Sequence, residues 1–157
     1  MTHEDFMRRA MELAREAAAA GEIPVGAVVV RQGRIIGEGR NRREEKQSAL
    51  SHAEIEAIEA ACAREGSWRL DGCDLYVTLE PCPMCAGAIL NARLRTVYYG
   101  ATDEKMGAVG SKLQLFALPF DTEVTVRSGV CGEECAELLR AFFCRLRKTK
   151  RNGEDAR

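Results

Sequence analysis

The sequence predicts an α/β protein, built as a three-layer α/β/α sandwich around a mixed five-stranded sheet. Its 157 residues are 46% hydrophobic, which suits one domain with a buried core. Short β-branched segments alternate with amphipathic helical segments along most of the chain. The later segments follow the order strand, helix, strand, helix, strand, which implies crossover connections and parallel pairing.

The N-terminal segment predicts a helix followed by a β-hairpin. Thr2 and Asp5 fit a helix start, and apolar residues then recur at helical spacing up to Gly21. Two short strands, 25–30 and 34–38, flank a turn at Gln32-Gly33. The polar stretch that follows, "RREEKQSALS", is expected to be an exposed loop.

The middle of the chain predicts two helices, each followed by a strand. Ser51 with Glu54 fits a cap for a helix that runs to about Arg64, and "DLYVTL" then fits a buried strand. Pro83 suits the first turn of the second helix, and "RTVYYGAT" fits the strand after it.

The last third predicts a mixed glycine-rich segment, the alternating strand "TEVTVRSG" and an amphipathic helix from about Cys131 with a basic end. No repeat, linker or composition shift marks a second domain. We therefore expect a single domain over residues 1–151 and a disordered tail over 152–157.

Charge and composition narrow the function classes. Lys plus Arg number 23 against 24 Asp plus Glu, so the chain as a whole is not an electrostatic nucleic-acid binder. Residues 1–22 carry charges of both signs without a long apolar run, so we expect neither a secretion signal nor a membrane anchor and place the protein in the cytoplasm. The seven cysteines are then expected to be reduced thiols or metal ligands.

Three residues form a candidate metal site. Cys82 and Cys85 stand three apart at a helix start, which puts both sulfurs on one face and favours their thiolates. Taken alone, this spacing fits a metal site, a redox pair or two buried thiols. His52 is the expected third ligand, because the other histidine, His3, lies near the N-terminus. Three ligands leave a fourth tetrahedral position for water, as in catalytic zinc sites.

Glu54 has two interpretations. One is helix capping with Ser51. The other is proton transfer, from a zinc-activated water to a ring nitrogen and then to a leaving amine. A His-x-Glu segment followed by Pro-Cys-x-x-Cys is the signature of zinc deaminases, and this chain has "HAE" and "PCPMC". The combined pattern predicts one Zn²⁺ per chain and hydrolysis of an amino group from a nucleobase, ahead of a structural zinc or redox site.

The chain also resembles the bacterial tRNA-specific adenosine deaminases of the cytidine deaminase superfamily. The segments "EIPVGAVVV", "GEGRNR", "HAEI", "LYVTLEPCPMCAGAI", "YYGATDEKMGAVGS" and "CAELLRAFF" follow the family's order over nearly the whole chain. The resemblance implies a zinc-dependent homodimer with the cytidine deaminase-like fold. It also implies conversion of the wobble adenosine of a tRNA anticodon to inosine.

Position by position, the resemblance assigns metal binding to His52, Cys82 and Cys85, and proton transfer to Glu54. It assigns substrate contacts to Asn41, the Ala53 backbone amide and Val25. From the residues alone, Asn41 fits a turn after a strand equally well, and Val25 fits core packing better.

An RNA substrate needs a local basic surface and a base outside the helical stack, as in an anticodon loop. Basic residues cluster at 140–151, although a solvated helix end would have the same composition. By resemblance, Lys105 and Lys112 adjoin the dimer contact and the RNA path. Phe142 and Phe143 cannot both face one way on a helix, so at most one is expected to contact a nucleotide.

One departure from the family bears on the substrate. The family commonly has an acidic or amide residue, proline and threonine shortly before the ligand histidine, whereas this chain has "SALS". That difference keeps open a free nucleobase or nucleoside deaminase, acting on guanine, cytosine or adenosine. A non-catalytic RNA-binding module with structural zinc is the alternative from another class. The remaining five cysteines are expected to be small buried hydrophobes.

Overall fold

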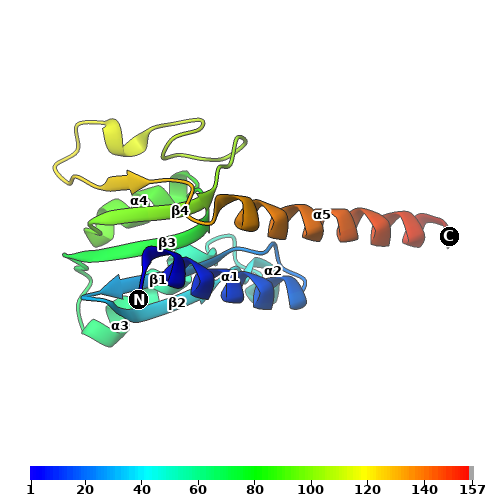
Figure 1. The fold of residues 1–157 in the computed structure, drawn as a ribbon, viewed down its shortest axis with the longest axis horizontal. Coiled ribbons are helices and arrows are strands. Elements are labelled where there is room, and N and C mark those ends of the chain that lie inside the picture. Colours follow the sequence, from blue (N-terminus) through cyan, green and yellow to red (C-terminus); the bar gives the residue numbers. More distant parts are fainter. Residues whose placement is uncertain (156–157) are drawn as a thin grey trace.

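The computed structural model describes residues 1–155, which form one five-stranded sheet with helices on both faces (Figure 1). The strands lie in the order β2-β1-β3-β4-β5. Their bounds are Gly26–Arg31 for β1, Arg34–Arg40 for β2, Cys73–Leu79 for β3, Thr96–Ala101 for β4 and Thr125–Arg127 for β5. The helices are α1 (His3–Ala19), α2 (Arg43–Lys46), α3 (Ala53–Glu65), α4 (Pro83–Ala92), the 3-10 turn η1 (Leu115–Ala117) and α5 (Gly132–Asp155).

The sheet is mixed, as the sequence predicts. β1 pairs antiparallel with β2, through a turn in which Gln32 and Gly33 both have positive φ, as type I′ hairpin turns require. β3, β4 and β5 pair in parallel. The expected parallel pairing does not extend to the hairpin, because β1 lies between β2 and β3 and runs antiparallel to both.

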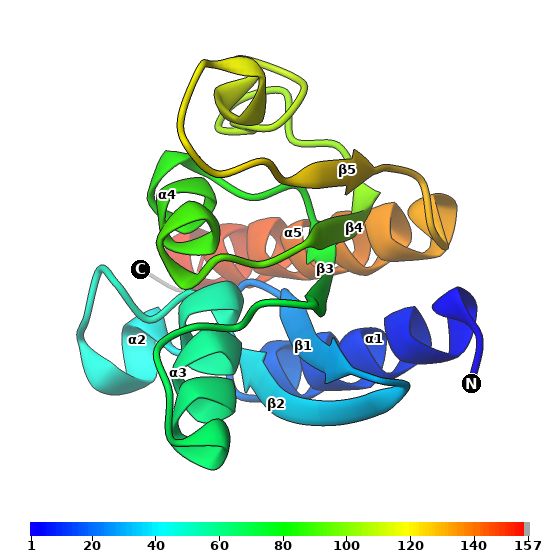
Figure 2. The same cartoon turned by 90° about the vertical axis from the view of Figure 1, so that its left-hand side faces the viewer.

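Two helical layers enclose the sheet (Figure 2). α1 and α5 cover one face, whereas α3 and α4 cover the other. Alternate residues of β1 feed the two cores: Ala27 and Val29 pack under α3 and α4, and Val28 and Val30 pack under α1. This alternation confirms the three-layer sandwich.

The capping interpretation of Ser51 and Glu54 is wrong. His52 is the N-cap residue of α3 and makes no side-chain capping bond, and Glu54 is turned into the protein with 4% of its surface exposed. The helix therefore begins one residue later than a Ser51 cap requires. Glu54 is left free for another role.

The exposed loop expected after the hairpin contains the short helix α2. The Glu22 carboxylate is buried and accepts hydrogen bonds from the amides of Glu44 at 3.0 Å and Glu45 at 2.8 Å. These amides lie in the first turn of the helix, where no intrahelical partner exists. A residue of the loop before β1 thus holds α2 in place, which composition alone does not indicate.

The C-terminal helix is longer than the sequence predicts. α5 begins beside Cys131 as expected but continues to Asp155, past the domain boundary expected at residue 151, because adding turns to an existing helix needs no new nucleation. Residues 156–157 of the expected tail lie outside the described residues. Within residues 1–155, every helix is too short or too polar to span a membrane.

Candidate metal and nucleobase site

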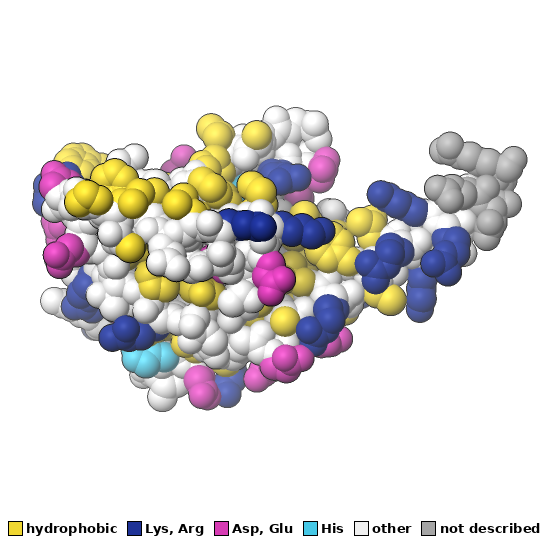
Figure 3. Space-filling view, turned by 90° about the horizontal axis from the view of Figure 1, so that it is seen from above, with side chains coloured by type: hydrophobic (Ala, Val, Ile, Leu, Met, Phe, Trp, Pro, Cys, Tyr) yellow, Lys and Arg dark blue, Asp and Glu magenta, His cyan; other side chains and the backbone are white. Residues whose placement is uncertain are grey.

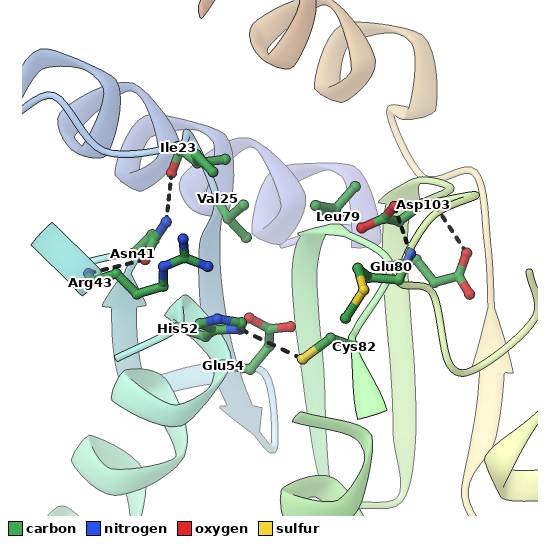
Figure 4. Close-up of a pocket in the computed structure, with 11 residues that line it drawn as sticks. Ile23, Val25, Asn41, Arg43, His52, Glu54, Leu79, Glu80, Cys82 and Asp103 are labelled. Atoms are coloured by element: carbon green, nitrogen blue, oxygen red, sulfur yellow. Dashed lines mark hydrogen bonds between the residues drawn. The ribbon is translucent and has the colours of Figure 1, made fainter. Parts of the chain in front are cut away.

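The starts of α3 and α4 meet beside the end of β3 (Figure 4). His52 is the N-cap residue of α3, Cys82 is the N-cap residue of α4, and Cys85 lies one turn into α4. Pro83 occupies the first turn of α4, where its missing N–H costs nothing. Residues 30 positions apart are thereby brought together under two positive helix ends, which favour thiolate ligands.

The three predicted ligands fit a tetrahedral metal ion. The His52 Nδ1 atom lies 3.6 Å from the Cys82 Sγ atom and 3.6 Å from the Cys85 Sγ atom. With zinc–sulfur and zinc–nitrogen bonds of about 2.3 and 2.05 Å, a tetrahedral nitrogen-to-sulfur edge is about 3.6 Å. Among the described residues, these three form the one group of His, Cys and acidic side chains close enough to hold a metal ion.

Glycines in β2 let α3 lie close enough to the sheet to fix this geometry. A Cβ atom on Gly39 would collide with the backbone of Ala53, and one on Gly37 would collide with the backbone of Ala57. Ala53 and Ala57 are themselves fully buried. The small residues on both sides therefore set the height of α3 above the sheet, and with it the position of His52.

The charge states at the site follow from burial and contacts. Burial raises the pKa of Glu54 to about 7. A hydrogen bond with Cys85, assisted by one with His52, lowers the pKa of Cys82 to about 4. The same bond with Cys82, together with burial, raises the pKa of Cys85. One thiolate already forms beside the imidazole, and Glu54 can both accept and release a proton near neutral pH.

A cavity of about 240 Å³ opens above these groups. Figure 4 shows Glu54, His52 and Cys82 at its base, with residues of the β1 and β2 ends on one side and residues after β3 and β4 on the other. Its walls are largely apolar. The lining residues are Ile23, Val25, Asn41, Arg43, His52, Glu54, Leu79, Glu80, Cys82, Asp103 and Met106.

Of the three residues predicted to contact the substrate, two line the cavity and the third, Ala53, does not. Val25 lines the cavity, as does Asn41. The Asn41 side chain also forms a turn, because its amide donates to the Ile23 carbonyl at 3.3 Å and its oxygen accepts from the Arg43 amide at 3.2 Å. The Ala53 side chain packs in the core, and its amide belongs to the first turn of α3.

Sequence reasoning missed several residues of the cavity wall. Arg43 and Met106 are exposed side chains from segments that the sequence leaves without regular structure. Glu80 lies between the end of β3 and the ligand Cys82, so its sequence position gives no sign of a role of its own. A buried carboxylate reveals itself through its partners, and those of Glu80 lie 23 to 31 residues away.

A second hollow lies between the middle of α5 and the loop after β4. It is lined by Lys105, Arg140, Phe143 and Arg147 among others. Phe143 is 37% exposed, while its neighbour Phe142 is half-buried and meets it edge-on. The two rings differ in environment, in keeping with their expected divergence on the helix.

Comparisons with known proteins show that the chain is similar to deaminases. A protein-family profile for MafB19-like deaminases matches residues 1–147. The tRNA-specific adenosine deaminase of Bacillus subtilis (strain 168) is 46% identical over 153 residues, covering 96% of this chain and 95% of that protein. The chain therefore belongs to the MafB19-like deaminase family and, within it, to the tRNA-specific adenosine deaminases.

Solved structures share the fold. One from a study of A-to-I editing by tRNA:A34 deaminases at the wobble position of transfer RNA is 48% identical, with a TM-score of 0.83 over 86% of this chain and 99% of that chain. A guanine deaminase from Nitrosomonas europaea is 26% identical, with a TM-score of 0.79 over 88% and 83% of the two chains. The expected cytidine deaminase-like fold is confirmed.

Proposed function

We propose that this protein is a zinc-dependent hydrolase that converts the wobble adenosine of tRNA to inosine. The observation that carries the proposal is the triangle of His52, Cys82 and Cys85 with Glu54 buried beside it at the base of a nucleobase-sized cavity. The 46% identity to a tRNA-specific adenosine deaminase over nearly the whole chain supports the RNA substrate.

Zinc would be held by His52, Cys82 and Cys85, whose two sulfurs and one nitrogen suit that ion. When bound, zinc supplies the Lewis acidity that lowers the pKa of a water molecule toward neutrality. The protein contributes by holding three ligands in a rigid arrangement, with one side left facing the cavity.

Glu54 would move the protons of the reaction. Its carboxylate is buried, and burial raises its pKa to about 7, so both protonation states are accessible during turnover. It first accepts a proton from the attacking water. It then donates that proton to N1 of the purine ring. In a second transfer it takes the remaining proton of the hydroxyl added at C6 and donates it to the amino group, which leaves as ammonia while the C6 carbonyl of inosine forms.

The cavity would hold one unstacked base. Val25, Ile23 and Leu79 supply apolar walls for the ring, and Asn41 supplies an amide oxygen that retains a free lone pair at the cavity wall. Because the base must leave its stack to reach Glu54, a single-stranded loop is the expected form of the substrate.

Basic side chains on α5 would bind the RNA backbone. The second half of this helix projects from the body of the protein and carries Lys and Arg side chains that Figure 3 shows clustered there. These side chains are exposed. Lys105, in the loop after β4, lines the second hollow together with Arg140, Phe143 and Arg147 of α5. The exposed basic residues of the helix are Arg145, Arg147, Lys148, Lys150 and Arg151.

We also propose that the protein acts in the cytoplasm as a homodimer. Phe120 and Leu118 are 48% and 46% exposed, and Phe120 borders a hollow with Leu90 of α4 and Leu115. Exposed apolar side chains around a groove favour burial against another protein surface. Sedimentation equilibrium of the zinc-loaded protein tests the dimer. We expect a mass of two chains per particle, and a mass of one chain would contradict the dimer.

The test of substrate class compares an adenosine-bearing anticodon stem-loop with free adenosine, cytosine and guanine. We expect inosine in the stem-loop and turnover of the free compounds at least about 100-fold slower, because phosphate contacts supply much of nucleic-acid affinity. Rapid turnover of a free base with an unmodified stem-loop would contradict the proposal and favour a nucleobase deaminase.

A further inference from the structure

The buried carboxylate of Glu80 lies beside the cavity and accepts four hydrogen bonds. It stands between β3 and the ligand Cys82 and is 2% exposed. Its oxygens accept hydrogen bonds from the amides of Asp103 at 3.1 Å, Val109 at 3.3 Å and Ser111 at 2.9 Å. The Ser111 hydroxyl donates a fourth at 2.5 Å. All four donors belong to one loop, residues 103–111.

The loop is built around this carboxylate. A Cβ atom on Gly107 would collide with the Glu80 carboxyl group, so the loop backbone can wrap closely around it only with glycine there. The loop is also joined to the neighbouring segment, since the Ala108 amide donates to the Pro81 carbonyl at 2.9 Å. Glu80 and its loop therefore form one unit attached to the start of α4.

This unit makes one wall of the cavity. Asp103 and Met106 line the cavity together with Glu80. Figure 4 shows Asp103 and Glu80 on the side across from Asn41 and Arg43. Met106 is 56% exposed, so little besides the backbone of its loop holds it in place. The Met106 amide donates to the Asp103 carboxylate at 3.1 Å, and the four hydrogen bonds to Glu80 hold the two ends of the same loop, at Asp103 and at Val109 and Ser111.

We propose that Glu80 is a positioning residue that holds loop 103–111 as the substrate-facing wall of the pocket. Glu80 acts on substrate binding through Asp103 and Met106. The identity of the substrate in this inference rests on the proposed function. Only an ionised carboxylate satisfies four donors without presenting a donor of its own. Glutamine has the same shape but turns an NH₂ group toward loop amides that also donate.

The experiment compares the zinc-loaded wild type with Glu80→Gln, Ser111→Ala and the double variant. We expect Glu80→Gln to raise KM for the stem-loop by about tenfold or more, the loss expected for hydrogen bonds to a charged group. We expect kcat to change less than threefold and zinc to remain at one per chain. Ser111→Ala should raise KM less, and it should add nothing in the Glu80→Gln background, because both act through one contact.

Amide hydrogen exchange supplies a readout that does not depend on activity. Exchange at Asp103, Val109 and Ser111 should accelerate by about tenfold or more in Glu80→Gln, while the Ala86 amide of α4 stays protected. Glu59→Gln is the matched control, since Glu59 is an exposed carboxylate on α3 that belongs neither to loop 103–111 nor to the cavity lining. It should leave both KM and loop exchange unchanged.

Two results would overturn the inference. Unchanged KM and unchanged loop exchange in Glu80→Gln would show that the loop does not depend on this carboxylate. Loss of zinc together with a fall in kcat would assign Glu80 to the metal-binding helix instead. Should Glu80→Gln not fold, Ser111→Ala decides alone through the same exchange and KM measurements. A wild type that leaves the stem-loop unmodified would refute the proposed function, whereas the exchange result would still stand.

Discussion

Glu54 and Glu80 are both buried beside the cavity, yet their surroundings give them opposite protonation behaviour. Burial raises the pKa of Glu54 to about 7. Burial also acts to raise the pKa of Glu80, but hydrogen bonds from Ser111, Asp103 and Val109 more than offset it and lower that pKa. A carboxylate with few donors is suited to move protons, and one with four donors is suited to hold a loop.

We expect the cysteines outside the metal site to differ in reactivity, because they differ in burial. Cys135 is 1% exposed, and burial raises its pKa to about 12, whereas Cys144 is exposed on α5. Because the thiolate is the reactive form, we expect Cys144 to be alkylated by iodoacetamide rapidly at pH 8 and Cys135 to remain unmodified up to about pH 9. Mass spectrometry of tryptic peptides measures both rates. Equal labelling of the two would contradict the burial of Cys135.

Individual residues also differ in how far the sequence predicts their place. The expected burial of the remaining cysteines is confirmed for Cys73 and Cys135, is only partial for Cys62 and Cys131, and is wrong for Cys144, which is exposed on α5. The ligands His52, Cys82 and Cys85 were predictable because metal ligands need fixed residue types at fixed spacing. Glu80 was not, since hydrogen-bond partners in a distant loop leave no local pattern.

At the scale of elements, the approach of α3 to β2 decides where His52 stands. Gly39→Ala would force a methyl group into the backbone of Ala53. We expect a loss of about 1–3 kcal/mol in the free energy of unfolding and weaker zinc binding. Urea denaturation and zinc titration measure the two effects.

Gly153→Ala is the matched control for that substitution. Gly153 lies in α5 with open space around its Cα atom, so alanine there should leave zinc affinity unchanged and favour the helix. Wild-type zinc affinity in Gly39→Ala would show that the contact between α3 and β2 does not set the ligand geometry.

Element boundaries were less predictable than element types. The hairpin turn, the start of α4 and the five strands follow from local residue preferences. The pairing of β3 with β1 does not, because strand order depends on which edges remain free after the hairpin forms. The helix α2 depends on Glu22, which is 22 residues from its partner Glu44, and so lies beyond any local pattern.

At the scale of the whole molecule, a net charge of -1 conceals a basic stretch of α5, where residues 145–151 contain five Lys and Arg residues and no Asp or Glu. We expect substitution of Arg147, Lys148, Lys150 and Arg151 by glutamine to weaken stem-loop binding. The slope of log K against log salt should fall by about 0.7 for each phosphate that the protein no longer neutralises. Binding measured by fluorescence anisotropy across salt concentrations gives the slope, and thermal unfolding serves as the control. An unchanged slope would exclude α5 from RNA binding.

The most direct measurement of the central claim is single-turnover inosine formation in the stem-loop by zinc-loaded Glu54→Gln. We predict a rate about 10²- to 10⁴-fold below wild type with one zinc per chain retained, because glutamine keeps the shape of the side chain but cannot carry the proton. Glu59→Gln, an exposed position on the same helix, should match wild type. A Glu54→Gln enzyme that forms inosine at the wild-type rate would contradict the proposed role of Glu54 in proton transfer.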